Sequence, residues 1–245
     1  MTLTEGMTGV RMTPAEDRRR AGLVFFVLAA QFMLVIMLAA SIAPGYDFNG
    51  AAISDLGVIA STALLFNASL VVVGVLNVLG GFLYYRSHRR GWVLVLFVLA
   101  AIGAIGTAAF PLDRGEVHSL FALVAFLFFN FEAIAVGTLV SGAMKLISVL
   151  AGALGLVFVV LMVIGDGGNT AAFGAIGHGG TERMIVYPAM LWMLALGGHL
   201  MAARDGARPD GTDPRTPRRA SRGLTGPRLA AAAARRLALA LLRKW

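Results

Sequence analysis

Six long apolar stretches dominate this sequence and limit what the chain can fold into. They cover residues 21–43, 61–84, 92–109, 118–140, 146–164 and 183–202. A helix needs about 20 residues, at about 1.5 Å each, to cross about 30 Å of hydrocarbon. The sequence therefore predicts an all-α fold, a polytopic bundle of six transmembrane helices.

Composition supports this prediction and excludes several classes of protein. Of the 245 residues, 58% are hydrophobic and only 14% are charged, whereas about 25% of the residues in a soluble domain are charged. An ordinary soluble enzyme, a disordered protein and a nucleic-acid-binding protein are therefore excluded, despite a net charge of +8. The chain has no cysteine, so a disulfide framework and thiol catalysis are excluded too.

The first apolar stretch has some features of a signal peptide, because it follows Arg18, Arg19 and Arg20. The hydrophobic region of a signal peptide is only about 7–15 residues long. This stretch is longer, and Gln31 is its only strongly polar residue before Ser41. We therefore expect it to be retained as the first transmembrane helix.

Basic residues are distributed unevenly about the predicted helices. Of the 21 Lys and Arg residues, all but Arg114 and Arg183 lie on one side of the membrane if the chain crosses it six times. Cytoplasmic loops are enriched in Lys and Arg. We expect both termini to be cytoplasmic, in a multi-pass protein of the inner (cytoplasmic) membrane.

The sequence outside the apolar region divides into three segments. Residues 1–20 form a basic N-terminal segment before the transmembrane domain of residues 21–203. Residues 204–226 are rich in Pro, Gly, Arg, Asp and Thr, a composition that predicts a disordered linker. Residues 227–245 are rich in Ala, Leu and Arg, which predicts a basic amphipathic helix bound to anionic inner-leaflet lipid. A tail that only aids solubility is the alternative.

Polar residues gather where the second, fourth and sixth helices begin, at the side with few basic residues. Capping of helix N-termini by side-chain oxygens explains part of this pattern. The alternative is a ligand-binding or catalytic site, in which Arg183 could hold a carboxylate or a lipid head group. The residues concerned are Ser54, Asp55, Asp113, His118, Glu182 and Arg183.

His118 is the strongest catalytic candidate among these residues. A histidine in the first turn of a helix is favoured in its neutral form, which can act as a general base or a metal ligand. Asp113 lies five residues earlier and could meet it. His178, in a glycine-rich and mobile loop at 165–180, could complete the site. Zinc is one option there, but the sequence lacks a paired-histidine motif, so it indicates no cofactor.

Three polar residues within the predicted spans are further candidates for ligand binding: Asn67, Asn130 and Glu132. Glu132 is the only acidic residue inside a span, and such residues usually face the bundle interior or a water-filled cavity. It follows His118 by fourteen residues, or about 21 Å along one helix face. A proton or cation pathway from His118 to Glu132 is one hypothesis, and a structural, hydrogen-bonded Glu132 is the other.

An ordered set of short motifs resembles the domain of unknown function 998 family. The set covers about residues 20–203 and consists of Ser54-Asp55-Leu56-Gly57, Phe66-Asn67 with Gly74, Phe110-Pro111-x-Asp113 with His118, and Glu182-Arg183 with Trp192. The resemblance implies a six-helix bacterial or archaeal membrane protein without an established activity. It implies no catalytic role for any of these residues.

A looser similarity links the chain to membrane hydrolases that include alkaline ceramidases and progestin-type receptors. These use a Ser, an Asp and three His around zinc, whereas this sequence has Ser54, Asp55 and His118 but no paired histidines on a late helix.

We expect a protein that binds a lipid or an amphipathic small molecule at a polar, outward-facing site. The alternatives are a metal-dependent hydrolase that uses His118 with Asp55 or Asp113, and a proton-coupled transporter that uses Glu132. Membrane lipids are the expected partners, without nucleic acid, and the sequence does not indicate an oligomeric state.

Overall fold

A computed structural model describes residues 13–202 of the protein. The predicted linker at 204–226 and the predicted amphipathic helix at 227–245 lie outside the described residues. Six long helices and three short 3-10 helices make up the described part, which contains no strand. The long helices are α1 (Pro14–Ile42), α2 (Ala63–His88), α3 (Gly91–Ala109), α4 (Glu116–Gly137), α5 (Gly142–Asp166) and α6 (Gly177–Ala202). The short ones are η1 (Ser54–Gly57), η2 (Leu112–Arg114) and η3 (Thr170–Ile176).

All six predicted helices are confirmed, and α1 and α6 begin earlier than predicted by the largest margins. α1 begins at Pro14, because the Thr13 hydroxyl accepts a hydrogen bond from the Glu16 backbone N–H and the Glu16 carboxylate accepts one from the Thr13 N–H. α6 begins at Gly177, so the prediction of a loop over the glycine-rich segment 165–180 is wrong, and the mobility expected of it stays a prediction. Most of that segment is the end of α5, η3 and the start of α6.

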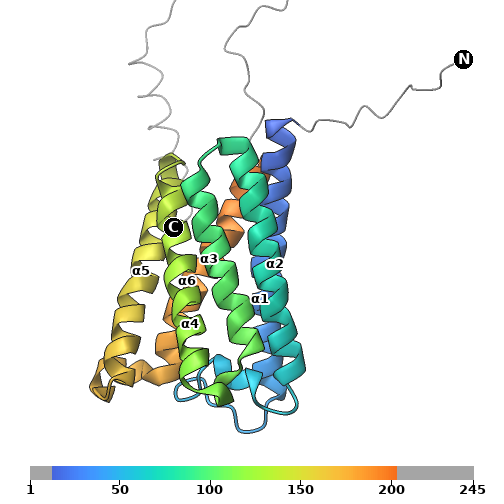
Figure 1. The fold of residues 1–245 in the computed structure, drawn as a ribbon. Helices are drawn as coiled ribbons and strands as arrows, with labels where there is room; N and C mark the ends of the chain where they lie inside the picture. The colour runs from blue at the N-terminus through green and yellow to red at the C-terminus, as the bar shows by residue number, and fades with distance from the viewer. Residues whose placement is uncertain (1–12, 203–245) are drawn as a thin grey trace, which may run out of the picture. The chain divides into compact units, whose positions relative to one another are not determined.

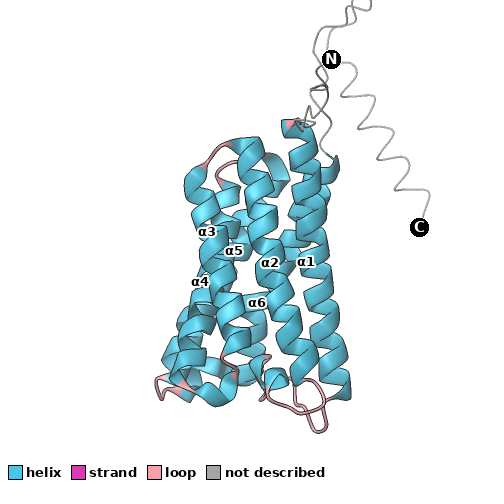
Figure 2. Ribbon diagram, turned by 45° about the vertical axis from the view of Figure 1, so that its right-hand side comes forward, coloured by secondary structure: helices cyan, strands magenta, loops and turns pink. Residues whose placement is uncertain are grey.

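The helices form a closed ring in sequence order (Figures 1 and 2). Each helix packs against its neighbours in the chain, and α6 packs against α1 to close the ring. Short connections make consecutive helices antiparallel. The starts of α2, α4 and α6 therefore lie at one end of the bundle, together with η1, η2 and η3.

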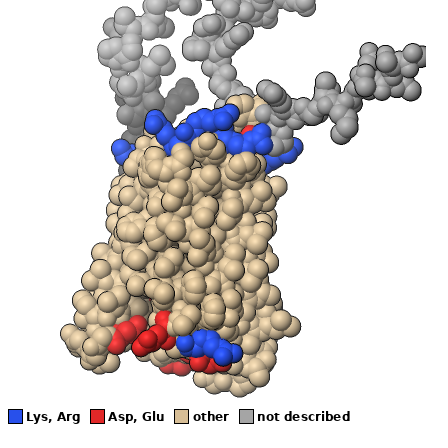
Figure 3. All heavy atoms as spheres, in the orientation of Figure 1, with Lys and Arg blue, Asp and Glu red and all other residues tan. Residues whose placement is uncertain are grey.

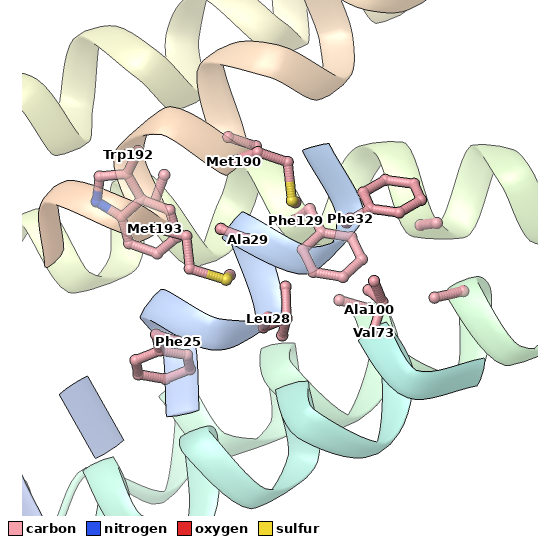
Figure 4. Packing of buried hydrophobic residues seen from close by; sticks show 14 of the residues in the cluster. Phe25, Leu28, Ala29, Phe32, Val73, Ala100, Phe129, Met190, Trp192 and Met193 are labelled. Atoms are coloured by element: carbon pink, nitrogen blue, oxygen red, sulfur yellow. The ribbon is translucent and has the colours of Figure 1, made fainter. Parts of the chain in front are cut away.

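Large apolar side chains fill the centre of the ring, and most of its helices contribute to this core. Figure 4 shows Leu28 and Phe32 of α1 near Phe129 of α4 and Met190 of α6. Phe25 of α1 stacks on Phe97 of α3 instead. A polar contact lies at the edge of the core, where Trp192 Nε1 donates a hydrogen bond to Ser148 Oγ at 2.8 Å. This bond joins α6 to α5.

The outer surface of the bundle is apolar as well. Leu34, Leu64, Leu120, Leu146 and Leu191 each expose more than half of their surface. In a soluble protein, large exposed apolar areas of this kind are rare. All six long helices have the length and hydropathy needed to cross a membrane. The chain is therefore a multi-pass membrane protein.

On the face that Figure 3 shows, charged residues occupy the two ends of the bundle and the middle carries none. We call the end with Arg18, Arg19, Arg20, Arg86, Arg89, Arg90 and Lys145 the basic end. The opposite, acidic end carries Asp47, Asp55, Asp113, Glu116, Asp166 and Glu182, with Arg114 and Arg183. At the basic end the buried Asp17 of α1 pairs with Arg86 of α2, whose Nε lies 3.0 Å from Asp17 Oδ2.

Candidate functional site

A pocket of about 260 Å³ lies at the acidic end, and we call it the polar pocket. It is formed by η1, the start of α4, the end of α5 and the start of α6, with Leu112 of η2 at its edge. Its polar lining consists of Ser54, His118, Ser119, Asp166, His178 and Glu182. Four of the residues singled out in the sequence, far apart in the chain, therefore meet in one pocket: Ser54, His118, His178 and Glu182.

A smaller cavity of about 60 Å³, the apolar pocket, lies among the helices of the bundle. Its walls are mainly apolar and include Phe32, Phe66 and Phe129. The apolar pocket and the polar pocket share four lining residues: Ser54, Ala122, Phe126 and Glu182. The two pockets are therefore adjacent parts of one site, with a polar entrance and an apolar interior.

His118 is buried in the wall of the polar pocket, with only 4% of its surface exposed. Its Nδ1 lies 2.8 Å from the backbone oxygen of Phe110. A carbonyl oxygen can only accept, so Nδ1 must carry the proton. In the neutral ring Nε2 is then an acceptor, and no residue of the described chain is hydrogen-bonded to it.

Glu182 links α6 to the segment that leads into η1. Its side chain is buried, and its carboxylate accepts hydrogen bonds from the backbone N–H groups of Ile53 and Ser54. These bonds hold the start of η1 against α6. Because Glu182 also lines both pockets, it places a carboxyl group where the polar entrance meets the apolar interior.

Arg183 follows Glu182 in the chain, but its side chain binds the loop between α1 and η1. Its Nη1 donates to the carbonyl oxygens of Phe48 and Ala51, both at 3.0 Å, and to that of Gly179 at 2.7 Å. Its Nη2 donates to the Tyr46 hydroxyl at 2.6 Å. The guanidinium also stacks on Phe48, with 4.7 Å between Cζ and the ring centroid. Arg183 lines neither of the two pockets, so its role as a ligand-binding residue stays a prediction.

The loop that Arg183 binds is ordered by its own polar groups as well. The Tyr46 hydroxyl donates to the Ala52 carbonyl at 2.7 Å, and burial raises the pKa of Tyr46 to about 12. The Asp47 carboxylate accepts from the backbone N–H groups of Gly50 and Asn49, and these bonds lower the pKa of Asp47. At neutral pH the phenol is therefore protonated and the carboxyl group ionised, as these hydrogen bonds require.

His178 lies in the first turn of α6, at the edge of the polar pocket. Its Nε2 is 3.2 Å from Asp166 Oδ1, and its ring packs edge-on against Phe173 of η3. These contacts tie the end of α5 to the start of α6. Asp166 is half-exposed, so one carboxylate of the pocket is open to ligands from outside.

Besides Arg183 and Glu132, three of the predicted site residues lie outside both pockets. Asp113 is exposed and 3.9 Å from Arg114, so the predicted meeting of Asp113 with His118 does not occur. Asp55 accepts a hydrogen bond from the Ala52 N–H at 2.8 Å, within the turn that leads into η1. Asn67 donates to the Gly57 carbonyl at 2.9 Å and lines a separate surface groove between α2 and α3. Asp55 and Asn67 thus hold η1 in place.

The two polar residues of α4 have different surroundings. Asn130 lines the apolar pocket and donates to the carbonyl oxygens of Phe126 and Ile185. Glu132 is fully buried and accepts from Asn77 Nδ2 of α2 at 2.7 Å. Glu132 lines neither pocket, and the predicted pathway from His118 to Glu132 stays a prediction.

The sequence-based prediction did not include most of the apolar lining. Phe126, Phe129 and Met190 line the apolar pocket, yet in the sequence they cannot be distinguished from core residues, because both kinds are apolar and face inward. Ser119 of the polar pocket could have been found, since it is a polar residue next to His118. Within residues 13–202, no three His, Cys, Asp or Glu side chains are arranged to hold a metal ion.

A family model matches most of the chain. The family model described as "Protein of unknown function (DUF998)" matches residues 26–199, which include every residue named above in the two pockets. No curated protein and no solved structure matches the chain.

Proposed function

This chain belongs to the DUF998 family of proteins of unknown function, and we propose that it binds a lipid or an amphipathic small molecule. One observation carries the proposal: a polar pocket and an apolar pocket share Ser54, Ala122, Phe126 and Glu182. A site with a polar entrance and an apolar interior is complementary to a molecule with a polar head and a hydrocarbon chain. The head group would lie near His118 and Asp166, and the chain would extend toward Phe129.

The proposal includes an orientation in the membrane. The basic end carries seven Lys and Arg residues in the described chain, namely Arg18, Arg19, Arg20, Arg86, Arg89, Arg90 and Lys145. Lys and Arg are enriched on the cytoplasmic side of membrane proteins. We therefore place the basic end and both termini in the cytoplasm and the polar pocket at the outer face of the cell membrane.

A labelling experiment tests the orientation. The chain has no cysteine, so a single introduced thiol can be labelled without background. Asn169→Cys at the acidic end is expected to react with a membrane-impermeant maleimide on intact cells. Arg90→Cys at the basic end, the matched control, is expected to react only after lysis, since both positions are exposed. The opposite pattern would reverse the orientation.

A substitution that fills the shared part of the two pockets tests the binding function. Ala122→Trp is expected to reduce the amount of co-purified lipid or amphiphile about tenfold, the effect of losing about 1.4 kcal/mol of binding free energy. Mass spectrometry of the bound small molecules provides the measurement. Leu120→Trp is the matched control, because Leu120 is on the same helix, is 60% exposed and lines neither pocket.

The proposal fails if no small molecule is enriched in the purified protein over the bulk membrane extract. It also fails if both tryptophan variants retain the same bound molecules as the unchanged protein. The thermal unfolding of each variant must be measured in parallel, because only a folded variant reports on the pocket.

The two other functions considered from the sequence have less support. A metal-dependent hydrolase would use His118 with Asp55 or Asp113, and neither aspartate lines the pocket that contains His118. A proton-coupled transporter would use Glu132, whose carboxylate accepts a hydrogen bond from Asn77 away from both pockets. The shared lining of the two pockets favours binding of an amphiphile over either activity.

A further inference from the structure

We infer that the polar pocket selects an amphiphile with an ammonium head group over one with an anionic head group. This inference rests on the proposed function, because it names the ligand class of the same site. It is carried by the polar atoms that the pocket offers to a ligand and by the position of the nearest cations.

His118 provides a hydrogen-bond acceptor that the fold holds in the wall of the pocket. Its side chain is almost fully buried, and its Nδ1–H is used by the Phe110 carbonyl oxygen at 2.8 Å. The remaining ring nitrogen, Nε2, has no hydrogen-bond partner in residues 13–202. Nε2 is therefore an acceptor that remains accessible in the wall of the pocket, and a ligand that donates a hydrogen bond to it is favoured.

Two carboxylates add acceptors to the same pocket. Asp166 contacts His178 through Oδ1, and its Oδ2 has no partner among the described residues. Glu182 lies deeper, where both pockets meet. A primary ammonium has three donors and no acceptor, and it is complementary to this set.

The cations at the acidic end are directed away from the pocket. No Lys or Arg is found among the described residues that line it. Arg183 is bound to the loop carbonyl oxygens of Phe48 and Ala51, and Arg114 is an exposed residue 3.9 Å from Asp113. An anionic head group would therefore meet the Asp166 carboxylate without a Lys or Arg in the pocket lining to neutralise it.

Helix N-termini also lie at this end and favour anions through their partial positive charge. At α4 this charge is met by Glu116 in the first turn, and at α6 the Gly179 N–H donates to the Asn49 carbonyl oxygen at 2.9 Å. The protein itself thus supplies the negative groups that the helix ends attract. The hydrogen-bond acceptors that line the polar pocket are therefore available to a cationic ligand.

A chain-matched series of amphiphiles tests the inference. Radiolabelled n-decylamine, n-decanol and n-decanoic acid share one chain length and differ in head-group charge. Each is bound to the full-length protein in phosphatidylglycerol nanodiscs, and the signal from Ala122→Trp in the same nanodiscs is subtracted. The pocket-specific affinity for decylamine is expected to be about tenfold higher than that for either of the other two.

Asp166→Asn serves as a second variant that is expected to fold, because the side chain is 54% exposed. It should weaken decylamine binding about threefold, as expected for an exposed charge, and weaken decanol binding less. Equal or tighter pocket-specific binding of decanoic acid or decanol overturns the inference but leaves the proposed function intact. If no probe distinguishes the unchanged protein from Ala122→Trp, the proposed function itself fails.

Discussion

Arg183→Ala is expected to lower the free energy of unfolding by about 3 kcal/mol or more. The substitution leaves the carbonyl oxygens of Phe48 and Ala51 and the Tyr46 hydroxyl oxygen without their donor. These hydrogen bonds are partly buried and their donor is charged, and each hydrogen bond to a charged group contributes about 1.5–3 kcal/mol. The loss is measured from unfolding in mixed micelles of increasing denaturing detergent, followed by tryptophan fluorescence.

Two further variants separate the specific role of Arg183 from its charge. Arg183→Lys keeps the charge, but an ammonium lacks the planar set of N–H donors of a guanidinium and cannot stack on Phe48 in the same way. The lysine variant is therefore expected to be more stable than Arg183→Ala and less stable than the unchanged protein. Arg114→Ala removes an exposed arginine at the same end of the bundle, and should cost at most about 1 kcal/mol. If Arg183→Ala costs no more than Arg114→Ala, the guanidinium does not hold the loop as described.

Gly103→Ala is expected to destabilise the protein by about 1–3 kcal/mol, because it forces α3 and α4 apart. A Cβ at this position would lie 2.4 Å from the backbone nitrogen of Ala125 and 2.7 Å from its Cα. Backbone atoms in the middle of a helix cannot rotate out of the way, so the two helices must separate. The midpoint of thermal unfolding measures the effect.

Gly198→Ala is the matched control for this prediction. Gly198 also lies inside a long helix, α6, and a Cβ there would meet no atom within 4 Å. The added methyl group is therefore expected to leave the unfolding midpoint unchanged or slightly higher. Equal midpoints for the two alanine variants would contradict the close packing of α3 on α4.

The residues of the candidate site could be predicted from the sequence only in part. Ser54, His118, His178 and Glu182 stood out as polar residues next to apolar stretches, and they share one pocket. Asp113 was expected to join them, but it projects outward from η2 and pairs with Arg114. The apolar lining, such as Phe126 and Met190, carries no sequence signal, because a pocket wall and a packed core use the same residue types.

The start of α6 shows why the glycine-rich segment at 165–180 was misread. Glycine has a low helix propensity, so a run of glycines predicts a loop. In the folded protein Gly179 lies so close to the Ala51 carbonyl oxygen that a Cβ would be 2.1 Å from it. Glycine is needed there for close packing against the loop between α1 and η1, and tertiary contacts keep the segment helical.

The membrane-spanning class, the number of long helices and the separation of charge between the two ends can be read from the sequence alone. These properties follow from local composition, because a membrane requires continuous apolar helices with charges at their ends. Which polar groups bind one another depends instead on how the chain packs in three dimensions. Arg183 and Glu182 are neighbours in the chain, yet Arg183 binds the loop at Tyr46 and Phe48 while Glu182 lines the two pockets. Successive residues on a helix project in directions about 100° apart, and the partner that each one meets depends on how distant segments pack.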